Sequence, residues 1–160
     1  MEIAIQIRHA AWRTALPEVR HVTRKAAKAA LAMKPRPDGG ELAVVLADDA
    51  MLRSLNNDYR GIDKATNVLA FAYGDAAANG ALGDVIISLE RTAAEAKQAG
   101  CGLGDHLSHL VIHGVLHLLG YDHGNDSDAE TMEALETRAL AGIGIANPYA
   151  PPGAMKDHER

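Results

Sequence analysis

Residues 104–123, GDHLSHLVIHGVLHLLGYDH, contain the most apolar run of the chain and five of its eight histidines. Residues 104–119 have the pattern of a helix, and Gly120 is suited to end it because glycine adopts left-handed backbone conformations easily. The run is too short and too rich in histidine to span a membrane. We therefore expect a largely buried helix that carries four histidines along one side: His106, His109, His113 and His117.

Four other segments have strand patterns, with alternating apolar residues or short apolar runs between turn residues. They are residues 3–7, 41–47, 67–73 and 84–89. Further helices are predicted from Leu16 to Met33, from Asp48 or Asp49 to about Asp58, from Arg91 to Gln98, and from a capping box of Ser127 and Glu130 to about Ala141.

This order of elements predicts an α+β fold with a small mixed four-stranded sheet packed by about five helices. The length of 160 residues and the hydrophobic content of 48% fit a single domain, which we place at residues 1–146. A metal site is expected at the end of the helix 104–119. The proline-containing tail, residues 147–160, is expected to be disordered.

Two features of the sequence indicate the cellular compartment of the protein. One cysteine, Cys101, leaves no internal disulfide framework and fits a reducing environment. The N-terminus, MEIAIQIRHAAWR, lacks the basic start, continuous apolar stretch and cleavage site of a signal peptide. We expect a cytoplasmic protein with no membrane partner.

The four helical histidines cannot hold one ion, because eight residues of helix rise about 12 Å while Zn–N bonds are about 2 Å. Either His109 with His113 or His113 with His117 would make a two-ligand clamp at i, i+4. Gly120 favours the second pair, because a turn there brings His123 back toward it. His113, His117 and His123 then predict three nitrogen ligands and an open fourth position, as in catalytic zinc sites. His106 and His109 remain neighbours of the site or surface residues.

The same spacing occurs in the metzincin proteases, H-E-x-x-H-x-x-G-x-x-H. This chain has Gly114 where those proteases have the glutamate that moves protons during peptide hydrolysis. Peptide hydrolysis is therefore the weaker interpretation of the motif.

The motif HGVLHLLGYDH (113–123) resembles that of the YbeY family of bacterial endoribonucleases. Three other stretches resemble the family in the same order: LNNDYRGIDKATNVLAF (55–71), GDVIIS (83–88) and MEALETRALAGIGIANPY (132–149). The family usually has T-D-V-L-S-F where this chain has Asn67 and Ala70, so neither residue is assigned a role.

The resemblance implies a single-strand-specific endoribonuclease that matures the 3′ end of small-subunit ribosomal RNA and acts in ribosome quality control. It implies one Zn²⁺ per chain on His113, His117 and His123, and a functional arginine at Arg60. Its partners would be RNA, the ribosome and ribosome-assembly proteins.

Chemically, bound zinc lowers the pKa of its water to about 7, so the nucleophile needs no protein base. Arg60 is suited to stabilise the extra negative charge of the transition state. Without the resemblance, Arg60 would equally be interpreted as a surface partner of Asp58 or Asp63.

The charge distribution is uneven, since residues 1–36 hold eight Lys/Arg and two Asp/Glu in a chain of net charge −5. Arg20, Arg24 and Lys28 form a stripe at i, i+4, i+8, which we name the basic stripe and expect to contact RNA phosphates. Two other classes stay open: a metzincin-like metallohydrolase acting on peptides, and a non-catalytic ribosome-assembly factor with structural zinc, which usually has four protein ligands.

Overall fold

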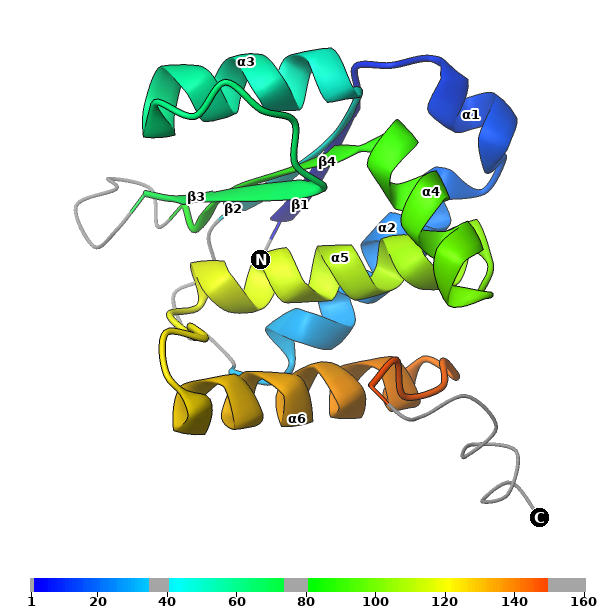
Figure 1. The fold of residues 1–160 in the computed structure, drawn as a ribbon. Helices are drawn as coiled ribbons and strands as arrows, with labels where there is room; N and C mark the ends of the chain where they lie inside the picture. The colour runs from blue at the N-terminus through cyan, green and yellow to red at the C-terminus, as the bar shows by residue number, and fades with distance from the viewer. Residues whose placement is uncertain (1, 35–40, 74–80, 150–160) are drawn as a thin grey trace.

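Four strands form one mixed sheet in the computed structural model, which describes residues 2–34, 41–73 and 81–149 (Figure 1). The strands are β1 (Glu2–Ile7), β2 (Glu41–Ala47), β3 (Val68–Ala72) and β4 (Gly83–Ser88). Their order is β1-β2-β4-β3. β1, β2 and β4 run parallel to one another, and β3 pairs antiparallel with β4 at one edge of the sheet. The predicted mixed four-stranded sheet is confirmed.

Six helices are present in the described ranges. They are α1 (Ala11–Ala15), α2 (Val19–Leu31), α3 (Asp49–Arg60), α4 (Leu89–Ala99), α5 (Leu103–Leu118) and α6 (Asp126–Gly142). Figure 1 shows α3 covering one face of the sheet and α5 lying across the other, with α6 beyond α5. This single α+β domain confirms the predicted fold class.

The core forms on both faces of the sheet. The larger cluster joins the sheet to the apolar sides of α2, α5 and α6, and it includes Val85, Ile112 and Leu116. The smaller one lies under α3 and includes Leu52 and Leu69. Alternate side chains of β3 enter opposite clusters, because successive residues of a strand point to opposite faces. Burial of α5 among the sheet, α2 and α6 fixes its position relative to β3.

Local signals explain most helix ends. The Asp48 carboxylate accepts the Met51 N–H at 3.0 Å at the start of α3, and Gly61 ends that helix with φ 68°. Ser88 caps α4. The predicted capping box of Ser127 and Glu130 is wrong, because Asn125 caps α6 by accepting the Asp128 N–H at 2.8 Å.

The short helix α1 was not predicted, and α2 begins three residues after the expected start at Leu16. Five residues give too little periodicity for a sequence pattern. Burial supplies the missing stabilisation, since Trp12 is fully buried and its indole N–H donates to the Ala47 carbonyl at 2.8 Å. No helix of the described ranges has the length and apolar character needed to cross a bilayer.

Candidate metal centre and its cleft

Three imidazoles meet at the C-terminal end of α5. His113 and His117 lie one turn apart on the helix, and Gly120, with φ 103°, turns the chain so that His123 returns to them. One ring nitrogen of each lies within 4.8 Å of those of the other two. The Nε2 atoms of His113 and His117 are 3.1 Å apart. These three histidines are positioned to bind a metal ion, and they form the only such group in the described part of the chain.

The environment of His117 favours a metal ligand. Burial lowers its pKa, and the neighbouring rings of His113 and His123 lower it further. The ring is therefore neutral at pH 7, as a metal-binding imidazole must be.

Glu136 of α6 supports the cluster from behind, and sequence reasoning missed it. Its carboxylate is almost fully buried, and it accepts hydrogen bonds from His113 Nδ1 at 2.7 Å, His109 Nε2 at 2.8 Å and the Tyr149 hydroxyl. Burial opposes its ionisation, but these three hydrogen bonds outweigh burial and lower the pKa of Glu136 to about 2.

An ionised carboxylate can only accept, so the proton of His113 must reside on Nδ1. Its Nε2 then presents a lone pair toward His117, which is the tautomer that a metal requires. A signal for Glu136 existed in the sequence. It lies four residues from both Met132 and Leu140, and is therefore an acid on the buried side of α6.

A cleft of about 540 Å³ opens beside the imidazoles. Its walls come from β3 and from the end of α5, and Arg60, Asp122 and His123 also line it. The structure thus brings Arg60 and the three histidines into one cavity. The alternative pairing of Arg60 with Asp63 is not observed, because Asp63 binds Arg53 with N–O distances of 2.7 and 3.1 Å.

Gly114 is required by packing. A Cβ atom on this residue would lie 2.6 Å from Val85 Cγ1 and 3.1 Å from Cγ2. Any side chain there would push α5 away from the sheet. The glutamate of the metzincin motif is therefore absent and also sterically excluded.

Asn67 and Glu95 explain one departure from the family pattern. The Asn67 amide donates to both carboxylate oxygens of Glu95 at 3.1 and 3.3 Å, and Glu95 also bonds His106 Nε2 at 2.8 Å. An aspartate at residue 67 would place a second carboxylate against Glu95. Asn67 is thus the residue that suits Glu95.

Asp122 lines the cleft, whereas the basic stripe lies on another part of the molecule. The Asp122 carboxylate accepts the backbone N–H of His123 at 2.7 Å, in the turn that follows α5. Arg20 and Arg24 donate to the carbonyls of Ile5 and Ile3 at 3.0 and 3.5 Å, beside β1.

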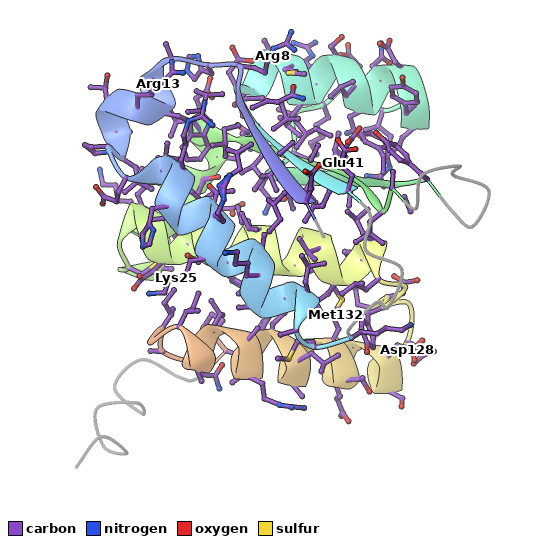
Figure 2. The ribbon with its side chains drawn as sticks, turned by 180° about the vertical axis from the view of Figure 1, so that it is seen from behind. Arg8, Arg13, Lys25, Glu41, Asp128 and Met132 are labelled. Carbon is purple, nitrogen blue, oxygen red and sulfur yellow. The ribbon has the colours of Figure 1, made fainter. Side chains whose placement is uncertain are left out.

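Since β1 and β3 are opposite edges of the sheet, the stripe lies away from the cleft. Figure 2 shows that side of the molecule, with α2 in front. Lys28 belongs to the same helix and is exposed.

Comparisons with known proteins agree with this architecture. The family model described as Endoribonuclease YbeY matches residues 4–144. A protein named Endoribonuclease YbeY from Paramagnetospirillum magneticum is 51% identical over 93% of this chain and 96% of its own length. The one from Azorhizobium caulinodans is 43% identical over 95% and 98%.

The fold also matches a solution structure from Thermotoga maritima with a TM-score of 0.53, at 20% identity over 88% of this chain and 91% of that one. The structural match shows the fold alone. The family model and the two relatives confirm the predicted resemblance, and the chain belongs to the YbeY endoribonuclease family.

Proposed function

We propose that this chain is a single-strand-specific endoribonuclease that hydrolyses phosphodiesters with one Zn²⁺ held by His113, His117 and His123. The observation that carries the proposal is the convergence of three imidazoles and Arg60 in one cleft. Three imidazoles that line an open cavity fit a catalytic zinc ion, which would keep one coordination position for water. The buried Glu136 carboxylate behind His113 also supports a metal site, because ligating histidines commonly donate their second N–H to such a group.

When bound, zinc supplies a water of lowered pKa and polarises a phosphoryl oxygen. The chain's residues do the rest. Arg60 binds the phosphate through its planar guanidinium and stabilises the charge that develops on it. Glu136 keeps the His113 proton on Nδ1. Tyr149 and His109 hold the carboxylate in place.

The substrate and setting follow from the family resemblance. We infer that a cytoplasmic protein, whose catalytic domain extends from the predicted residues 1–146 to include Tyr149, acts on the 3′ end of small-subunit ribosomal RNA and in ribosome quality control together with ribosome-assembly proteins. The basic stripe of Arg20, Arg24 and Lys28 would contact phosphates of the RNA outside the cleft. Each arginine uses one N–H toward β1 and keeps others for this purpose.

Metal analysis of the purified chain, coupled to cleavage of unstructured RNA, tests the proposal. We expect one zinc per chain and cleavage that a chelator removes and zinc restores. His117→Ala should lose both metal and cleavage, and Arg60→Ala should lose cleavage while it keeps the metal.

An unstructured peptide serves as the second substrate in the same assay. Cleavage of the peptide but not of RNA would contradict the proposal. So would full RNA cleavage by the chelated protein.

A further inference from the structure

β3 is an edge strand, and its outer side faces the cleft beside the histidines. All five of its residues, 68–72, line the cavity. The opposite side of β3 pairs with β4. The backbone groups that point away from β4 therefore point into the same space as the three imidazoles and Arg60.

The hydrogen-bonding register identifies those groups. Ser88 N–H donates to the Asn67 carbonyl at 2.9 Å, and Tyr73 N–H donates to the Leu82 carbonyl at 3.1 Å. In an antiparallel ladder, bonded and non-bonded pairs alternate. Residues 69 and 71 therefore bond to β4, and residues 68, 70 and 72 turn their N–H and C=O groups outward.

We name these outward groups of Val68, Ala70 and Ala72 the β3 edge. The Val68 N–H is already bound by the Asn67 side chain at 2.7 Å. The N–H groups of Ala70 and Ala72 have no acceptor among the described residues. Two donors thus face the cleft, spaced by two residues of strand, or about 6.8 Å.

The surroundings of the β3 edge favour an anionic, extended ligand. Two backbone donors, the Arg60 guanidinium and the cluster of metal-binding imidazoles share the cleft, while Asp122 is its only acidic lining residue in the described ranges. The methyl side chains of Ala70 and Ala72 allow a backbone to approach closely. The cavity of about 540 Å³ is too small for both strands of a duplex.

We propose that the β3 edge is the binding site for the single-stranded RNA backbone. The amides of Ala70 and Ala72 donate to phosphate oxygens and direct the strand past the histidines. This inference rests on the proposed function and adds to it the surface that selects a single strand. An extended peptide, which would pair with the same edge by strand addition, is the competing occupant.

Replacement of single amides by esters tests the proposal in the metal-loaded protein. Lactic acid in place of Ala70 or Ala72 removes one N–H and leaves the side chain unchanged. The matched control places the α-hydroxy analogue of phenylalanine at Phe71, whose N–H points toward β4. Binding is measured with a labelled oligodeoxythymidylate, which presents the same phosphates and is not a substrate for a ribonuclease.

We expect each ester at 70 or 72 to weaken binding roughly tenfold, the value of a hydrogen bond to a charged acceptor. KM for unstructured RNA should rise by a similar factor with kcat little changed. The Phe71 ester should lower the melting temperature and leave affinity within about twofold. Ala70→Pro provides a genetic version, because proline is tolerated on an edge strand where its missing N–H faces outward.

Unchanged oligonucleotide affinity in folded 70 and 72 esters would overturn the proposal. Weakened binding of an extended peptide, with nucleic acid binding intact, would overturn it in favour of a peptide site. A wild-type protein that binds through the β3 edge but cleaves no RNA would contradict the proposed function alone. RNA cleavage with unaltered KM in both esters would contradict only the inference about the β3 edge.

Discussion

The two edge strands of the sheet, β1 and β3, differ in what surrounds their outward backbone groups. At β1, the guanidinium groups of Arg20 and Arg24 bind the carbonyls of Ile5 and Ile3. At β3, the outward backbone groups line the cleft that holds the three histidines. Exposed edges promote unwanted strand pairing, so proteins usually cover them. Among the described residues, side chains therefore bind the β1 edge, which lies away from the cleft, while the β3 edge beside the three histidines has no such cover.

The largest effect is expected from a change at Glu136, which supports the histidine cluster on the β3 side of the sheet. In Glu136→Gln, the single amide oxygen cannot replace both carboxylate oxygens that accept from His113 and His109. The NH₂ group of the glutamine then faces the N–H of one of these two rings, and two donors oppose each other. Where that NH₂ group faces His113, the ring must take the tautomer with its proton on Nε2, which blocks metal binding. We expect metal affinity to fall about 10- to 100-fold, as measured by competition with a chelator.

Glu130→Gln is the matched control, since Glu130 lies exposed on the same helix. It should leave metal affinity unchanged. Wild-type affinity in Glu136→Gln would show that the imidazoles hold their orientation without the carboxylate.

A smaller effect is expected at the residue that precedes β3. Asn67→Asp turns a donor–acceptor contact with Glu95 into two facing carboxylates. The free energy of unfolding should fall by about 1 to 2 kcal/mol, measured by urea denaturation at neutral pH. Glu95→Gln in the same chain should restore most of it, because the glutamine amide can donate to the introduced carboxylate. Equal losses in the single and double variants would rule out this pair as the cause.

Asn67 also shows where sequence reasoning ends. The strands, the mixed sheet, the buried helix and the meeting of three histidines were predictable because each depends on local periodicity or on one glycine turn. Glu95 lies 28 residues from Asn67, and Glu136 lies 23 residues from His113. These partners are set by how α4 and α6 pack on α5, which no local pattern reports.

The position of the basic stripe relative to the cleft could not be predicted for the same reason. Its spacing correctly placed the three residues on one side of α2. Which edge of the sheet that side faces depends on the strand order β1-β2-β4-β3, which the sequence pattern does not determine.

The β1 edge provides the third prediction. Arg20→Ala removes a partly buried hydrogen bond and should cost about 1 kcal/mol of unfolding free energy. Lys28→Ala, on the same stripe but exposed, should cost little stability. If Arg20 and Lys28 both contact phosphates, each of the two substitutions should lower by about one the number of ions released when RNA binds, as measured from the salt dependence of affinity. An unchanged salt dependence in both variants would leave the stripe with only its structural role at β1.

The smallest effect concerns the loop that follows α3 on the β3 side. Hydrogen bonding to Arg53, and then the charge of Arg53, lower the pKa of Asp63. A lowered pKa stabilises the fold above the ordinary pKa of aspartate, and this contribution disappears as pH falls through the lowered value. Arg53→Gln should therefore melt slightly below wild type at neutral pH and together with it in acid. The Asp63 pKa, followed by NMR, should return upward to its ordinary range.

The Arg53→Gln variant also tests whether the Arg53–Asp63 pair keeps the Arg60 guanidinium available to bind phosphate in the cleft. Once released from Arg53, the Asp63 carboxylate is three residues from Arg60 and can compete with phosphate for its guanidinium. We expect a modest rise in KM for RNA at neutral pH that Asp63→Asn abolishes in the same chain. Because both partners of the pair are exposed, a large loss of stability in Arg53→Gln would contradict this account. It would mean that the loop depends on Arg53 through contacts other than Asp63.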